Sequence, residues 1–168
     1  MIQFVSEDVF NQIDGVRQII AGEYSRKFAV IELEGKLGNY GLSWNSDLIE
    51  PIVKRSPDQS ALWIGVDRQL AAICLRTGRV LLKLNLFTNL VNIEFADSKA
   101  AVIAETEVFT FNESATTMVS YWLPEIAIDA VFFEAKLSVK LLDGQEFILD
   151  LQTGKSTISN PLVRSPGS

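Results

Sequence analysis

The feature that most constrains how this chain folds is a repeat in its second half. An apolar run, a short polar turn and a second apolar run occupy residues 62–75, and the same order returns at residues 137–151. A weaker copy begins at Ala100. Leu62, Ala100 and Leu137 stand at equivalent places, so the copies are 38 and 37 residues apart. A repeat of about 40 residues that contains several strands predicts one small β-sheet per copy.

Turn residues between the apolar runs predict antiparallel hairpins. Asp143 and Gly144 separate two apolar runs, and Asp-Gly is a strong hairpin signal because both turn positions favour a positive φ. Gly78 and Gly154 each follow a threonine and precede a basic residue, where a left-handed residue can close a loop of three or four residues. The second half is therefore predicted to consist of antiparallel strands joined by tight turns.

The order of these elements resembles a blade of the quinoprotein-like or WD-repeat β-propellers. Residues 62–66, 70–73 and 77–80 carry the resemblance, which covers about residues 60–155. It implies blade-like antiparallel sheets. It implies no cofactor-binding or catalytic residue, because the repeated Trp-Asp signature and the tryptophan-docking motif are absent. The whole chain also resembles small bacterial proteins, cyanobacterial ones included, that carry such repeats.

The first residues predict the one convincing helix of the chain. Between Ser6 and Gly22 apolar residues recur at spacings near 3.6, which places them on one helix face. Ser6 can cap the start of this helix, and Gly22 can end it. We expect one domain over residues 1–155, with a helix at 6–22, and a flexible tail at 156–168.

The predicted fold class is mostly β: an antiparallel meander or sandwich, or partial-propeller-like repeats, with one N-terminal α-helix. We expect about eight to ten strands and a rough fourth unit at Phe28. Three blade-sized units leave an open sheet edge, which invites pairing with another chain. We favour a compact sandwich or meander capped by the helix. Dimerisation through the edge and an open propeller fragment that docks on a partner are the alternatives.

The absence of histidine restricts the chemistry open to this chain. Its 168 residues include no His and one Cys, which excludes Ser-His-Asp and Cys-His catalysis, zinc sites and iron–sulfur clusters. We predict no cofactor, although a carboxylate-only Mg²⁺ or Ca²⁺ site stays open. Cys74 lies in an apolar run and is predicted to be a core thiol. A lone cysteine and an acidic N-terminus without an apolar leader predict a cytoplasmic location.

The charge of the chain indicates its type of partner. The net charge is −6 and the sequence pI is about 4.7, which lacks the basic footprint of a nucleic-acid-binding protein. No apolar run approaches the length of a membrane span. Residues 99–150 carry nine acids and three bases. We therefore predict a protein partner with a basic surface, or self-association through a sheet edge, and neither nucleic acid nor membrane.

Paired carboxylates are the one catalytic option that the sequence offers. Glu105 and Glu107 flank a turn, and Asp129 and Glu134 flank an apolar strand. A carboxylate-dependent hydrolase needs two such groups close together, one of them with a raised pKa. Acids in a tight turn usually point to water, and no nucleophile or phosphate-binding motif is present. We therefore predict that the chain is not an enzyme, with a hydrolase as the second alternative.

Aromatic residues beside acids predict a partner-binding surface. Trp and Tyr are the usual anchors of protein interfaces, and several lie at strand ends near Glu or Asp. For each aromatic residue taken singly, and for Trp63 above all, a place in the core is the leading interpretation. The predicted partner-binding residues are Tyr40, Trp44, Glu113, Tyr121, Trp122, Glu125 and Asp129.

The function predicted from these features is a non-catalytic, cytoplasmic protein-binding module that acts through an acidic surface. Small acidic inhibitors such as bacterial toxin-immunity proteins share its charge and size. The first alternative is a small-molecule-binding domain with a pocket between the sheet and the helix.

Overall fold

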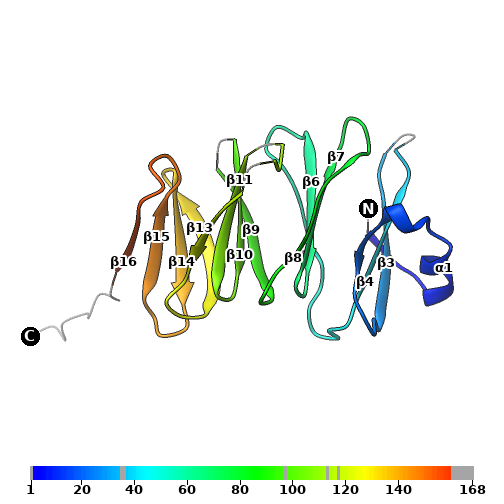
Figure 1. Cartoon of the computed structure of the whole chain (residues 1–168), viewed down its shortest axis with the longest axis horizontal. Coiled ribbons are helices and arrows are strands. Elements are labelled where there is room, and N and C mark those ends of the chain that lie inside the picture. The colour runs from blue at the N-terminus through cyan, green and yellow to red at the C-terminus, as the bar shows by residue number, and fades with distance from the viewer. Residues whose placement is uncertain (1, 35–36, 97, 113, 117, 160–168) are drawn as a thin grey trace, which may run out of the picture.

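Four four-stranded β-sheets stand side by side along the long axis of the molecule (Figure 1). The computed structural model describes residues 2–34, 37–96, 98–112, 114–116 and 118–159. Sixteen strands lie in these residues, more than the eight to ten expected. The predicted class is confirmed as mostly β with partial-propeller-like repeats and one N-terminal α-helix. The favoured sandwich is replaced by an open row of sheets, because the inner sheets bury both faces against their neighbours.

The strands pass through the four sheets in chain order. The first sheet contains β1 (Ile2–Phe4), β2 (Gln18–Ala21), β3 (Lys27–Glu32) and β4 (Asn39–Trp44). The second contains β5 (Ile52–Arg55), β6 (Ala61–Val66), β7 (Gln69–Cys74) and β8 (Val80–Asn85). The third contains β9 (Leu90–Ala96), β10 (Lys99–Ala104), β11 (Glu107–Asn112) and β12 (Met118–Trp122). The fourth contains β13 (Ala127–Phe133), β14 (Lys136–Leu141), β15 (Glu146–Asp150) and β16 (Ser156–Ser159).

The repeat predicted from the sequence is present in the strand registers. The second, third and fourth sheets are antiparallel meanders with their strands in sequence order. Positions that are equivalent in the sequence have equivalent cross-strand partners. The partners of Leu62, Ala100 and Leu137 are Ile73, Phe111 and Leu149. Each repeat is therefore one complete sheet.

Each sheet interface is an apolar layer built by side chains that alternate in direction along a strand. In β10, Ala100 and Val102 belong to the core shared with the second sheet, whereas Ala101 and Ile103 belong to the core shared with the fourth. Trp63 is buried between the second and third sheets, as predicted. The central strands are therefore apolar on both faces.

The predicted helix at residues 6–22 is wrong in its length. Helix α1 (Glu7–Asn11) is one short turn capped by Ser6, and a 3₁₀ turn (Gly15–Arg17) follows it. Residues 18–21 form β2, which pairs in parallel with β4. The regularly spaced apolar residues of this segment are distributed over α1, the 3₁₀ turn and β2, and do not lie on one continuous helix. The long-range pairing with β4 supplies the backbone hydrogen bonds that a longer helix would have made itself.

Helix α1 covers the outer face of the first sheet (Figure 1). Gly41 lies in β4, and a Cβ atom there would come within 2.8 Å of Cε2 of Phe10 and 3.1 Å of Cδ1 of Ile13. The ring of Phe10 also contacts that of Phe28, with centroids 5.4 Å apart. Helix and sheet are therefore in direct contact at Phe10, in the region where the alternative prediction places a small-molecule pocket.

The outer face of the fourth sheet has polar residues at central positions where the matching face of the third sheet is apolar, and beside them β13 exposes Val131 and Phe133. Ala101, Ile103 and Val108 of the third sheet are fully buried against the fourth. The equivalent residues of the fourth sheet, from the registers of β14 and β15, are Ser138, Lys140 and Glu146. The Ser138 hydroxyl donates a hydrogen bond to Oε2 of Glu146 at 3.1 Å. Terminal units of repeat proteins place polar residues on their outer face, as Ser138, Lys140 and Glu146 do here.

The end of the described chain differs from the predicted tail. Residues 156–159 form β16 and pair with β15, so the tail does not begin at residue 156. Residues 160–168 lie outside the described residues. Within the described part of the chain, no helix has the length and apolar character needed to cross a membrane.

Packing between the second and third sheets can be tested at Gly65. A Cβ atom at this position would come within 2.2 Å of Cδ2 of Leu90 in the next sheet. We expect Gly65→Ala to lower the free energy of unfolding by about 1–3 kcal/mol, because added volume in a packed core forces side chains to shift. Gly15→Ala is the control, since nothing lies within 4 Å of its Cβ position. Equal urea midpoints for the two variants would contradict this account of the interface.

The role of the polar residues on the outer face can be tested by exchanging residues between equivalent positions. Ile103→Lys places a charge in the buried interface, and we expect a loss of about 4 kcal/mol or more in the free energy of unfolding. Lys140→Ile should leave stability nearly unchanged because Lys140 is exposed, but it should promote self-association by adding apolar surface. Chemical unfolding and light scattering measure the two effects. A strongly destabilised Lys140→Ile variant would contradict the assignment of this face.

Candidate partner-binding site

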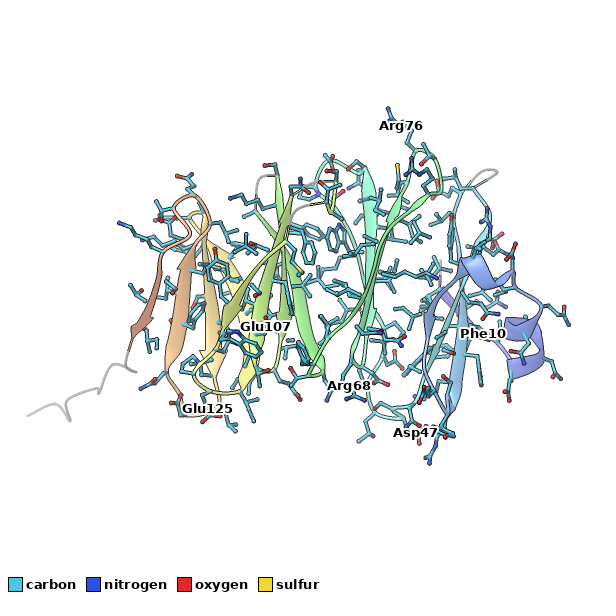
Figure 2. All side chains as sticks on the ribbon, in the orientation of Figure 1. Phe10, Asp47, Arg68, Arg76, Glu107 and Glu125 are labelled. Atoms are coloured by element: carbon cyan, nitrogen blue, oxygen red, sulfur yellow. The ribbon has the colours of Figure 1, made fainter. Side chains whose placement is uncertain are left out.

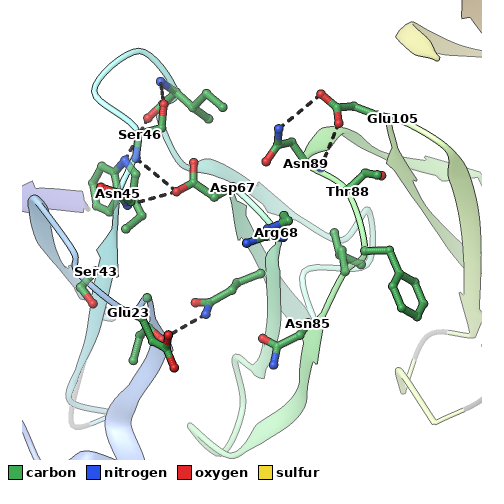
Figure 3. Close-up of a pocket in the computed structure, with 17 residues that line it drawn as sticks. Glu23, Ser43, Asn45, Ser46, Asp67, Arg68, Asn85, Thr88, Asn89 and Glu105 are labelled. Carbon is green, nitrogen blue, oxygen red and sulfur yellow. Dashed lines mark hydrogen bonds between the residues drawn. The ribbon is translucent and has the colours of Figure 1, made fainter.

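The loops at one edge of the sheet row form a groove of about 950 Å³. This edge is the lower one in Figure 2, where Asp47, Arg68 and Glu125 are labelled, and it lies opposite the edge that carries Arg76. The groove is lined by the end of the first sheet, the β6–β7 turn, the loop at residues 86–89 and Glu105 (Figure 3). Parts of three sheets therefore meet at this site.

Two acids at equivalent repeat positions stabilise the walls of this groove. Oδ2 of Asp67 accepts hydrogen bonds from the backbone N–H groups of Asn45, at 3.1 Å, and Ser46, at 3.2 Å. Glu105, 38 positions later, accepts from the backbone N–H and the side-chain amide of Asn89, both at 3.3 Å. Each acid thus ties the central turn of its own sheet to the loop that enters that sheet. In the fourth sheet the equivalent residue is the exposed Leu142.

The groove has buried acceptor atoms without a hydrogen-bond partner in the described structure. These atoms are Oδ1 of Asp67 and Oε1 of Gln69. The amide nitrogen of Gln69 is engaged, since it donates to the carbonyl of Ala21 at 3.1 Å. Arg68 lines the groove together with three acids, Asp67, Glu105 and Glu23. The groove is therefore polar, with more acids than bases.

An exposed pair of aromatic rings lies at the rim. Phe87, which lines the groove, is 76% exposed, and Trp122 at the end of β12 is 66% exposed. Their ring centroids are 6.4 Å apart, with an angle of 35° between the ring planes. Large apolar side chains grouped on a surface are typical of interaction sites.

Hydrogen bonds at Thr106 hold together the loops that carry this pair. The hydroxyls of Thr88 and Thr106 are 3.2 Å apart, and the N–H of Leu123 donates to the carbonyl of Thr106 at 2.9 Å. The N–H of Ala127 donates to the carbonyl of Glu105 at 2.7 Å. Phe87 and Trp122 therefore project from a fixed base.

The acids flanking the β10–β11 turn do not both point to water, which corrects the expectation from the sequence. Glu105 is half-buried, and Glu107 is only 4% exposed. Oε2 of Glu107 is buried and has no hydrogen-bond partner in the described structure. In the β11–β12 register Glu107 lies directly across from Trp122.

The second predicted acid pair, Asp129 and Glu134, is exposed. Glu134 has a positive φ of 47° in the turn after β13. Among the described residues, no group of three or more Cys, Asp and Glu could hold a metal ion.

Tyr40 and Trp44, predicted as partner-binding residues, belong to the core, and each is 1% exposed. The Tyr40 hydroxyl donates to the carbonyl of Gly78, and the guanidinium of Arg17 lies 5.0 Å from the centre of its ring. The indole N–H of Trp44 donates to the carbonyl of Ile49 at 3.0 Å. Neither ring offers a face to a partner, because the second sheet covers both.

The other predicted site residues are spread along the third and fourth sheets. Tyr121 is half-buried against the core shared by these sheets. Glu125 is half-buried, and its Oε1 accepts from the N–H of Ile126 at 2.8 Å. Asp129 is exposed and accepts from the N–H of Ala130 at 2.8 Å. Glu113 lies outside the described residues. Trp122 is thus the predicted aromatic residue that reaches the rim.

Cys74, predicted to be a core thiol, is half-buried at the end of β7. A hydrogen bond with the hydroxyl of Thr77 lowers the pKa of this thiol. The thiol belongs to the turn that Thr77 and Gly78 form.

Sequence reasoning missed Phe87 and Asp67. An aromatic residue followed by Thr and Asn at the end of a strand was the available signal for Phe87. Asp67 stands in a turn that the sequence predicts, and its φ of 50° agrees with that turn. The loop that its carboxylate binds lies 21 and 22 residues earlier in the chain, so no local pattern could identify its partners.

Comparison with known proteins shows which fold this structure is similar to. No family model matches the sequence, and no curated protein matches it. The structure is similar to the N-terminal domain of Nup159, with a TM-score of 0.55 and 9% identity, over 65% of this chain and 33% of that one. It is similar to the WD40 repeats of RRP9, with a TM-score of 0.55 and 9% identity, over 67% of this chain and 39% of that one.

A third similar structure is the β-propeller domain of Cps50 (Swd1) from Myceliophteria thermophila. The TM-score is 0.54 and the identity 12%, over 66% of this chain and 38% of that one. The chain thus spans between a third and two fifths of these propellers. At such identities the likeness shows the fold alone, and it agrees with the resemblance to WD-repeat blades found in the sequence.

Proposed function

We propose that this chain is a non-catalytic protein-binding module. It contacts its partner through the edge of the sheet row that carries the groove and the Phe87–Trp122 pair, which we call the loop edge. The observation that carries the proposal is the exposed pair Phe87 and Trp122 at the rim of the groove. Aromatic anchors, Trp above all, supply a large share of the binding energy at protein interfaces. Both rings project from loops held by hydrogen bonds around Thr106, so little conformational freedom is lost on binding.

The similar structures support this class of function. They are WD40 propeller domains, which are typically protein-interaction modules. One of them is a complex in which Dbp5 from S. cerevisiae is bound to Nup159. We transfer from them only the use of a blade-like scaffold to hold a binding surface.

The finer features of the proposal rest on charge and composition. A net charge of −6 favours a partner with a basic surface. Inhibition of such a partner by covering its basic site, as an immunity-type protein does, is the form of binding that we propose for an acidic module of this size. The single half-buried cysteine supports a cytoplasmic setting.

The groove suits a protein segment better than a small molecule. Its lining is mainly polar, whereas small-molecule sites are mostly apolar. A protein partner can use the groove and the aromatic rim together, since Phe87 belongs to both.

The proposal is tested with the double variant Phe87→Ser/Trp122→Ser. A partner is first captured by cross-linking to the wild-type chain and identified, and its affinity is then measured with the purified variants. We expect the double variant to bind about tenfold or more weakly, because it removes both anchors. Its unfolding midpoint should change little, since both rings are exposed.

The matched control is Val131→Ser/Phe133→Ser, which removes two exposed apolar side chains from the fourth sheet. This control should keep wild-type affinity. If the control loses binding while the Phe87→Ser/Trp122→Ser variant retains it, the loop edge is not the binding surface.

A further inference from the structure

We propose that Phe87, Trp122 and Glu107 together form a receptor for a cationic side chain, arginine or lysine, on a basic segment of the partner. This inference rests on the proposed function and names the chemistry of the partner at the same site. A cation is attracted to the face of an aromatic ring when it lies within about 6 Å of the ring centre. Both rings of the pair are exposed enough to receive one.

The segments that form this rim are acidic. Residues 86–89, 105–107 and 121–127 contain three acids, Glu105, Glu107 and Glu125, and no Lys or Arg. Hydrogen bonds at Thr106 and Glu105 join the three segments. Arg68, the basic residue that lines the groove, belongs to the β6–β7 turn and not to these three segments. A cation placed on the two rings would therefore lie close to the carboxylates of these same three segments.

The second, independent observation is that Glu107 is buried while its Oε2 has no hydrogen-bond partner in the described structure. A buried carboxylate is costly unless it is paired, and Oε2 of Glu107 has no partner in the described structure. Glu107 and Trp122 are directly opposite on adjacent strands. Such residues point to the same face with their Cβ atoms about 5 Å apart. The negative charge of Glu107 is thus held beside the ring of Trp122, and a bound cation would compensate it.

Comparison among the repeats shows that this arrangement belongs to the third sheet. The residues equivalent to Glu107 are Gln69 in the second sheet and Gln145 in the fourth. In the second sheet, the residue across from Gln69 is Asn85. The same place therefore holds a neutral Gln–Asn pair in one repeat and a Glu–Trp pair in the next. Glutamine satisfies the fold at this position, so the packing of the sheets does not require the charge of Glu107.

The inference is tested with labelled peptides of equal length: one rich in arginine, one rich in lysine, and one neutral. Binding is followed by fluorescence anisotropy and by the emission of tryptophan. The tryptophan signal reports mainly on Trp122, because Trp44 and Trp63 are each 1% exposed. We expect the basic peptides to bind and to change this emission, and the neutral peptide to do neither. Binding should weaken as salt is raised, since exposed charges are screened.

Two variants separate the parts of the receptor. Trp122→Leu removes the ring. Glu107→Gln introduces the residue that the second and fourth sheets carry at this position. Each should weaken binding of the basic peptides by about fivefold or more. The matched control is Glu134→Gln, which makes the same change as Glu107→Gln but at an exposed site in the turn after β13. It should leave the affinity unchanged.

A stability measurement on Glu107→Gln distinguishes a binding role from a structural one. Removing an unpaired buried charge should raise Tm, by about 2–4 °C for a chain of this size, while the affinity falls. A lower Tm would mean that Glu107 supports the fold, and would overturn the inference. Equal binding of basic and neutral peptides, or an equal loss in Glu134→Gln, would also overturn it. If any of these results overturns the inference, weaker binding of the partner by Phe87→Ser/Trp122→Ser would still support the proposed function.

Discussion

Face-to-face packing of the sheets is the constraint on which the rest of this structure depends. All six residues of β6 are buried, because alternate side chains enter two different apolar layers. A sheet at either end of the row has one face without a neighbour. The first sheet covers that face with α1 through the contact of Phe10 with Gly41. The fourth sheet carries Ser138, Lys140 and Glu146 at the centre of that face, beside the exposed Val131 and Phe133 of β13.

Because the faces of the inner sheets are used in packing, the sheet edges are the surface left for recognition. At the loop edge, Asp67 and Glu105 bind the backbone of the loops that enter their own sheets. These bonds occur at equivalent positions of the second and third sheets, whereas the exposed residues next to them differ between the two sheets. The scaffold therefore fixes where side chains are displayed, and the loops determine which ones they are.

Sequence reasoning succeeded where the signal was local and failed where distant segments decide. The hairpins around Gly78 and Gly144 depend on a few adjacent residues, so their turns were predictable, and both glycines have a positive φ. The helix at residues 6–22 was overestimated because the partner of β2 lies in β4. Trp122 was predicted as a partner-binding residue and is exposed. Tyr40 and Trp44 were predicted in the same way, and they could not be assigned to the core without knowing that the second sheet covers them.

Repetition offers a way to separate residues kept for folding from residues kept for function. Where the repeats agree, as at the apolar positions of Leu62, Ala100 and Leu137, packing is a sufficient reason. Where one repeat departs from the others at a cost in stability, packing cannot be the reason. Glu107 is such a departure, since it buries a charge where the other repeats have glutamine. Its position across from an exposed tryptophan therefore points to recognition of a cation rather than to the needs of the fold.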